Sequence, residues 1–206
     1  HLQHVAPSVS TFANTWQYEA RKELSHLQNK IERIQMSGKW SAPVAMGWIV
    51  KHIPPAWNLQ LGNGMALRYA QLQPLTSVHR IDSNRGVSGI DGCTSTAVGA
   101  SHAYESAPTL LITGDMSFLY DVGALSSNLI TPRLKIIVLN NGGGGIFRHI
   151  ASTSRLPETA RLLKCGLNVP VESLARTFGF DYLRVESYEE LRPAFMALQN
   201  NCSRPV

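Results

Sequence analysis

The sequence has few cysteines and no long apolar run, and these absences exclude several classes of protein. Its three cysteines, Cys93, Cys165 and Cys202, are widely spaced in a chain of 206 residues, which predicts neither a disulfide framework nor a zinc site. No apolar stretch approaches the roughly 18 residues needed to cross a bilayer. The first residues also lack the charged and apolar regions of a signal peptide. We therefore expect a cytoplasmic protein.

Runs of basic residues are missing as well. The formal net charge of +5 would by itself admit a nucleic acid, a membrane surface or acidic small molecules as partners. The lysines and arginines are scattered, however, with no run of five or more, and aromatic residues do not alternate with them. We predict no nucleic-acid partner and interpret most of the charge as solvated surface.

What is present is an alternation of apolar strands and helices, with a hydrophobic content of 44%, enough for a sizeable core. Amphipathic spacing predicts a first helix over residues 12–36, and Pro43 in a first turn suits a second helix that ends before Pro54. The remaining predicted strands are 59–61, 78–82, 110–112, 135–139 and 182–185, and the remaining predicted helices are 94–103, 171–179 and 187–199. This order predicts an α/β fold in three α/β/α layers around a parallel sheet.

Polar residues follow two of the predicted strands at their carboxyl ends. Gly114 and Asp115 follow strand 110–112, and Asn140 and Asn141 follow strand 135–139. Ligands of open α/β sheets lie outside the carboxyl ends of the strands, so we expect both clusters to face one site. One turn supplies a carboxylate and the other an amide.

The donor types at these turns suit a divalent cation that holds a diphosphate. Mg²⁺ prefers oxygen donors and takes few of them from protein, and the Asp115 carboxylate, the Asn141 amide oxygen and a main-chain carbonyl of Gly143 form such a set. The run 142–145 consists of four glycines, which lets the backbone approach a phosphate closely. The alternative interpretation is an ordinary strand end with a glycine turn.

Four motifs carry a resemblance to a known family. They read GNGMALR at 62–68, SNRGVSGIDG at 83–92, GDMSFLYD at 114–121 and NNGGGGIF at 140–147. The chain resembles the thiamine-diphosphate enzymes in their diphosphate-binding domain. Among these it is most similar to the 2-succinyl-5-enolpyruvyl-6-hydroxy-3-cyclohexene-1-carboxylate synthases of menaquinone biosynthesis. It departs from the pattern at Gly64, where the family commonly has Ser, and Met116 stands where the wider superfamily has Gly.

The resemblance implies a transferase with thiamine diphosphate and Mg²⁺, or Mn²⁺, as cofactors. It implies 2-oxoglutarate and isochorismate as substrates, with Arg68 and Arg85 binding their carboxylates, a task that guanidinium groups suit. The implied metal ligands are Asp115, Asn141 and Gly143. The implied cofactor-binding residues are Ile90, Gly114, Asp115, Met116, Ser117, Asn141, Gly143, Gly144, Ile146 and Phe147.

The family also implies parts beyond this chain. We expect residues 1–40 to be a helical linker from a preceding domain, and 41–206 to be the diphosphate-binding domain, truncated at its C-terminus. The glutamate that activates the cofactor belongs to a pyrimidine-binding domain of the same or a partner subunit, in a homodimer or tetramer. We therefore expect no catalytic residue in this chain and no activity from it alone.

Other interpretations stay open on the sequence. Another thiamine-diphosphate enzyme, of the acetolactate-synthase or 2-keto acid decarboxylase type, would keep Asp115 and Asn141 without needing two arginines. A non-catalytic assembly module would keep the fold alone. Either arginine could instead bridge to a helix end or to a nearby aspartate, and the apolar site residues could simply be core. A Rossmann dinucleotide site is disfavoured, because no Gly-x-Gly-x-x-Gly opens a helix in the required place.

Overall fold

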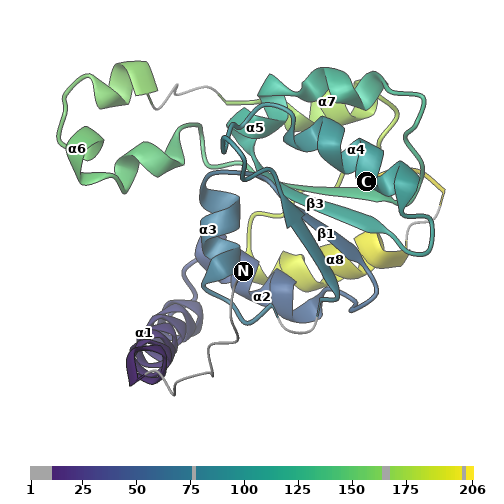
Figure 1. Cartoon of the computed structure of the whole chain (residues 1–206). Helices are drawn as coiled ribbons and strands as arrows, with labels where there is room; N and C mark the ends of the chain where they lie inside the picture. Colours follow the sequence, from purple (N-terminus) through teal and green to yellow (C-terminus); the bar gives the residue numbers. More distant parts are fainter. Residues whose placement is uncertain (1–10, 76–77, 164–167, 201–202) are drawn as a thin grey trace, which may run out of the picture. The chain divides into compact units, whose positions relative to one another are not determined.

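The computed structural model describes residues 11–75, 78–163, 168–200 and 203–206, and Figure 1 shows the path of the chain. Its contacts divide the chain into two compact units, with the boundary between Lys39 and Trp40. The described part of the first unit is one helix, α1 (Thr11–Met36), as the spacing of its apolar residues predicted.

The second unit is built on a parallel sheet of four strands in the order β2-β1-β3-β4. The strands are β1 (Asn58–Leu61), β2 (Arg80–Ser83), β3 (Thr109–Gly114) and β4 (Leu134–Leu139). From β1 the chain continues to β2 on one side, and from β3 it continues to β4 on the other side. The direction of winding therefore reverses between β1 and β3, and open α/β sheets bind ligands at the carboxyl ends of such a strand pair.

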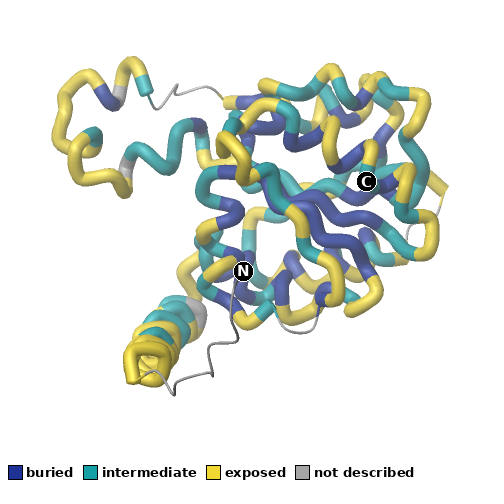
Figure 2. The backbone as a smooth tube through the Cα atoms, viewed as in Figure 1, coloured by how far each residue is buried: buried dark blue, intermediate teal, exposed yellow. Residues whose placement is uncertain are grey.

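Helices cover both faces of the sheet, which confirms the predicted three layers (Figure 1). One face carries α2 (Ala42–His52), α3 (Met65–Gln71) and α8 (Tyr188–Asn200). The other carries α4 (Cys93–Ala103), α5 (Asp115–Tyr120), the 3-10 helix η1 (Val122–Ser126) and α7 (Val171–Thr177). The central strands are the most deeply buried part of the unit (Figure 2), as expected for a parallel sheet covered on both faces.

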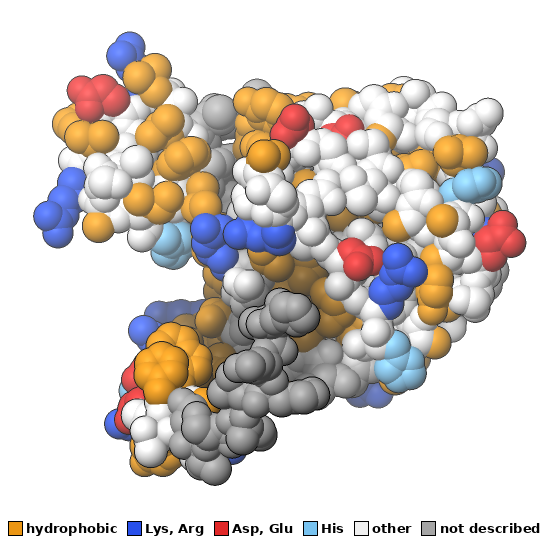
Figure 3. All heavy atoms as spheres, in the orientation of Figure 1, with side chains coloured by type: hydrophobic (Ala, Val, Ile, Leu, Met, Phe, Trp, Pro, Cys, Tyr) orange, Lys and Arg blue, Asp and Glu red, His pale blue; other side chains and the backbone are white. Residues whose placement is uncertain are grey.

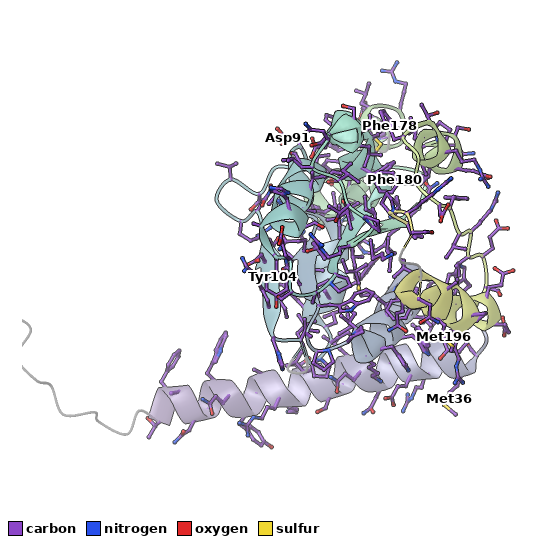
Figure 4. The ribbon with its side chains drawn as sticks, turned by 90° about the vertical axis from the view of Figure 1, so that its right-hand side faces the viewer. Met36, Asp91, Tyr104, Phe178, Phe180 and Met196 are labelled. Atoms are coloured by element: carbon purple, nitrogen blue, oxygen red, sulfur yellow. The ribbon has the colours of Figure 1, made fainter. Side chains whose placement is uncertain are left out.

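Local sequence explains how α2 and α4 are placed. Pro43 lies in the first turn of α2, where a missing N–H costs nothing, and Pro54 disfavours helical geometry at Ile53. Helix α4 presents small side chains to the sheet, among them Ala97, which is fully buried. Figure 4 shows Asp91 and Tyr104 at opposite ends of this helix.

One sequence-based prediction of structure is wrong, because residues 182–185 do not form a strand. The edge of β4 pairs instead with Val206, whose carbonyl accepts a hydrogen bond from the Ile136 amide at 2.7 Å. The position beside β4 is therefore taken, and from the neighbouring segment Asp181 bonds to this end of the chain, through its amide to the Pro205 carbonyl at 2.9 Å. The sequence also did not predict the helix α3, in whose last turn Arg68 lies.

The described residues of the stretch 151–170, whose sequence has no clear apolar periodicity, contain two short helical segments. These are α6 (Ala151–Ser154) and the π-helical η3 (Thr159–Leu163), and they follow the 3-10 helix η2 (Gly145–Arg148). The Thr153 hydroxyl ties α6 to η2 by donating to the Phe147 carbonyl at 3.1 Å. Among the described residues, no helix has the combination of length and apolar character that a bilayer span requires.

Candidate diphosphate site at the carboxyl ends of β1 and β3

The candidate site lies where β1 and β3 end side by side. Gly62 prolongs β1, and its amide donates to the Ile112 carbonyl of β3 at 2.8 Å. A side chain at position 62 would not fit, because a Cβ there would lie 2.5 Å from Thr113 Oγ1 and 2.9 Å from Thr113 Cβ. The two strands thus end in close contact, and Asn63 and Asp115 leave them next to each other in space.

Asp115 is the central residue of this site. Its side chain is only 3% exposed, and it stands at the first position of α5. Its Oδ1 accepts a hydrogen bond from the Met116 amide at 2.8 Å, and its Oδ2 accepts one from the Gly143 amide at 2.7 Å. The carboxylate therefore joins the turn after β3 to the glycine run after β4, as the sequence predicted for these two clusters.

The glycine run adopts backbone conformations that other residues avoid. Gly142, Gly143 and Gly144 have φ values of 80°, 88° and 33°, in the left-handed region that favours glycine. Asn141 is exposed, and its amide lies against Gly145, where a Cβ would come within 2.8 Å of Asn141 Nδ2. The run thus places the Gly143 amide against the Asp115 carboxylate, while the Asn141 side chain packs against Gly145.

The loop 84–92 forms a further wall of the site. The Ser117 hydroxyl, one turn into α5, donates to the Ile90 carbonyl at 2.6 Å, while the Ile90 side chain is 36% exposed. On the β1 side, the buried Asn63 donates through Nδ2 to the Asn84 carbonyl at 2.8 Å and to the Gly89 carbonyl at 2.6 Å. Asn63 was noted in a motif but given no role, because nothing in the sequence shows which backbone groups it meets.

The two predicted substrate-binding arginines are both exposed and make different hydrogen bonds. Arg85 Nη1 donates to Asn63 Oδ1 at 3.1 Å. Arg68 donates to the Gly64 carbonyl, at the start of its own helix, at 3.1 Å. Neither has a described ion pair with Asp82 or Asp91. Figure 3 shows Lys and Arg side chains gathered over α3 and the end of the sheet where β1 and β3 stop.

The remaining predicted cofactor residues lie beside Asp115 in the chain and in η2. Gly114 and Met116 flank it and are half-buried, and the buried Ser117 follows. Ile146 and Phe147 are half-buried in η2. The roles of all these residues in binding stay predictions.

The residues at this end of the sheet fit a metal diphosphate. Asp115 is one buried carboxylate with backbone donors around it, and the left-handed glycines leave the run free of side chains. The hydroxyl of Thr113, two residues before Asp115, is buried without a hydrogen-bond partner. Among the described residues, no three or more His, Cys, Asp or Glu side chains lie together in a way that could hold a metal ion, so a cation here would take most of its ligands from phosphate and water.

A cavity of about 750 Å³ lies beside β4 but is not the centre of this site. It is lined by apolar residues such as Ile137, Phe180 and Phe195, and it touches the site only at Asn140, Asn141 and Gly142. Neither Asp115 nor the arginines line it. Figure 4 labels Phe180 at this side of the sheet, close to α7.

We predict that Gly62→Ala destabilises the domain. The added Cβ would overlap Thr113, and overpacking of this kind costs about 1 to 3 kcal/mol, which lowers the melting temperature by about 2 to 12 °C at this chain length. Differential scanning calorimetry measures the change. The matched control is Gly99→Ala, since a Cβ on that exposed residue of α4 meets nothing within 4 Å and alanine favours a helix. Equal melting temperatures for the two variants would show that the β1–β3 contact tolerates a side chain.

The fold and the site together define a class of protein. The carboxyl ends of strands at the reversal of a parallel sheet are where open α/β sheets bind ligands, and backbone amides of a left-handed glycine run suit an anionic group such as a phosphate. Residues 63–206 match the family described as "Thiamine pyrophosphate enzyme, C-terminal TPP binding domain". The chain belongs to this family, whose domain binds thiamine diphosphate.

Similar proteins share one name, 2-succinyl-5-enolpyruvyl-6-hydroxy-3-cyclohexene-1-carboxylate synthase. The protein of Porphyromonas gingivalis is 39% identical over 202 residues, which is 95% of this chain and 34% of that protein. The protein of Flavobacterium psychrophilum is 44% identical over 134 residues, 65% of this chain and 24% of that protein. The protein of Christiangramia forsetii is 38% identical over 161 residues, which is 78% of this chain and 28% of that protein. The chain thus spans about a third or less of the length of these relatives.

Proposed function

We propose that this chain is the diphosphate-binding domain of a synthase that joins decarboxylated 2-oxoglutarate to isochorismate by a 1,4-addition, in menaquinone biosynthesis. The observation that carries the proposal is the Asp115 carboxylate, buried and bonded at both oxygens to the backbone of the two motif turns. The shared name of the relatives supports the particular reaction.

The proposed cofactor contacts follow from the position of each residue. Asp115, the Asn141 amide and the Gly143 carbonyl hold Mg²⁺ or Mn²⁺, and the glycine run receives the diphosphate with its backbone amides. Ile90 presents its side chain from the loop that Ser117 holds. Thiamine diphosphate, when bound, supplies the carbanion chemistry, while the protein positions the reactants and excludes water.

The proposed substrate contacts are those of Arg68 and Arg85. Both substrates are dicarboxylates, and a guanidinium group can hold a carboxylate by two parallel hydrogen bonds. Arg85 extends from the loop after β2, and Arg68 from the helix after β1, so the two approach the site from neighbouring strands. We further propose that a pyrimidine-binding domain, from the same or a partner subunit of a homodimer or tetramer, completes the site.

Substitution of Arg85 tests the proposed substrates. In the intact protein, Arg85→Gln should raise the KM of at least one of the two dicarboxylates by about tenfold to a hundredfold, the loss expected for a hydrogen bond to a charged group. The KM of pyruvate, which has one carboxylate, should change much less. Steady-state kinetics with each substrate gives the comparison.

The matched control is Arg80→Gln. Arg80 lies at the start of β2, whereas Arg85 follows its end, and Arg80 pairs with Asp82 at 3.0 Å and stacks over Tyr104 at 5.5 Å. Its substitution should leave the preference for dicarboxylates unchanged. The contrary result is that the intact protein uses pyruvate as readily as 2-oxoglutarate, with a ratio of the two KM values that Arg85→Gln does not alter. That result would favour an enzyme of the acetolactate-synthase or decarboxylase type instead.

A further inference from the structure

Asn63 makes three side-chain hydrogen bonds to one loop from a buried position. The residue is 3% exposed. Its Nδ2 donates to the carbonyls of Asn84 and Gly89, and its Oδ1 accepts a hydrogen bond from Arg85 Nη1. Asn63 follows β1, whereas its partners belong to the loop that follows β2. The side chain therefore connects the ends of two strands at the site.

The loop 84–92 is also attached to two helices, α5 and α4, by hydrogen bonds that do not involve Asn63. Ser117 of α5 holds the Ile90 carbonyl. The Asn84 side chain donates to the Gly92 carbonyl at 3.2 Å and to Thr96 Oγ1 at 2.9 Å, which fastens the loop to the start of α4. Among these described attachments, only Asn63 contacts the guanidinium group of Arg85.

The chemistry at position 63 requires an amide. Two backbone carbonyls point at Nδ2, so this atom must donate, and the Arg85 guanidinium points at Oδ1, so that atom must accept. An ionised aspartate would place a second acceptor against the two carbonyls. It would also neutralise Arg85 and compete with any carboxylate that Arg85 binds. Asparagine directs the guanidinium while leaving its charge available to a ligand.

We propose that Asn63 is a positioning residue, which fixes the direction of the Arg85 guanidinium and thereby the affinity for a dicarboxylate substrate. The inference rests on the proposed function, because it assumes that Arg85 binds a substrate carboxylate. Asn63 itself acts through Arg85 and the loop.

A double-mutant cycle in the intact protein tests this role. Asn63→Asp should raise the KM of the dicarboxylate that Arg85 binds by about tenfold, the loss expected from one hydrogen bond to a charged group, with a smaller change in kcat. In an Arg85→Gln background the same substitution should have little further effect, because residues that act as one unit are not additive. Equilibrium dialysis with that dicarboxylate should show the same pattern in the dissociation constant.

The matched control is Asn84→Asp. The Asn84 side chain also donates twice, but to the Gly92 carbonyl and to Thr96 of α4, so the effect of its substitution should add to that of Arg85→Gln. Circular dichroism and the melting temperature establish that each variant folds. Should Asn63→Asp not fold, Asn63→Ser replaces it, since a hydroxyl is uncharged and too short to reach all three partners.

The outcomes separate the two proposals. If Arg85→Gln leaves dicarboxylate binding unchanged, the proposed substrate role of Arg85 is wrong. If Arg85→Gln weakens binding but the effect of the Asn63 substitution simply adds to it, Arg85 binds substrate and Asn63 only supports the fold. Strong coupling of Asn63, together with additivity for Asn84, is the result that supports a positioning role.

Discussion

Replacing Asp115 with asparagine should weaken the binding of thiamine diphosphate to the intact protein by at least about a hundredfold. The carboxylate accepts hydrogen bonds from the amides of Met116 and Gly143, and a bond to a charged group contributes about 1.5 to 3 kcal/mol. The asparagine amide has nearly the same shape, but its NH₂ group would face one of these N–H donors. The same substitution would also remove the one carboxylate ligand of the proposed metal ion.

Isothermal titration calorimetry at fixed Mg²⁺ measures this loss. The matched control is Asp121→Asn, six residues further on, where the carboxylate accepts from the amide and hydroxyl of Ser95 at 2.6 and 2.9 Å. That contact stabilises the start of α4 and lies outside the proposed site. Asp121→Asn should lower stability by about 1 kcal/mol and leave cofactor affinity nearly unchanged. Similar affinities for the two variants would mean that Asp115 serves only the fold.

The convergence of Asp115 and the glycine run was predictable from the sequence, because a general rule governs it. Apolar runs marked β3 and β4 clearly, and parallel strands present their carboxyl ends on one edge of the sheet. Polar residues directly after two such strands must therefore meet. The hydrogen bond from the Gly143 amide to the Asp115 carboxylate shows that these two segments do meet.

The parts that the sequence did not predict depend on contacts between distant segments. Residues 182–185 have the composition of a strand, yet a strand needs a free ladder, and Val206 pairs with the β4 edge. The short helix α3 lacks a clear apolar period, so the sequence did not predict the helix that carries Arg68. The hydrogen bonds of Asn63 involve backbone carbonyls 21 and 26 residues away, and no side-chain pattern marks such groups.

The glutamates of this chain bear on which domain supplies the group that activates the cofactor. All nine glutamates lie among the described residues, and each is exposed. General acid–base catalysis by a carboxyl group at neutral pH depends on burial or neighbouring charges that tune its pKa. None of the nine has a described contact with a proposed cofactor residue. We therefore propose that the glutamate that activates the cofactor comes from the pyrimidine-binding domain.

The 206-residue chain alone should consequently show no measurable decarboxylation of 2-oxoglutarate. Loss of one acid–base group lowers the rate by about 10² to 10⁴, and the missing walls of the site lower it further. Carbon dioxide release by the isolated chain, with circular dichroism to confirm folding, is compared with that of the intact protein. As a control, Glu158→Gln in the intact protein removes the one glutamate in the segment 149–163 after η2 and should leave the rate nearly unchanged. Turnover by the isolated chain at the intact rate would place the activating group within it and would overturn the proposed division of the site between two domains.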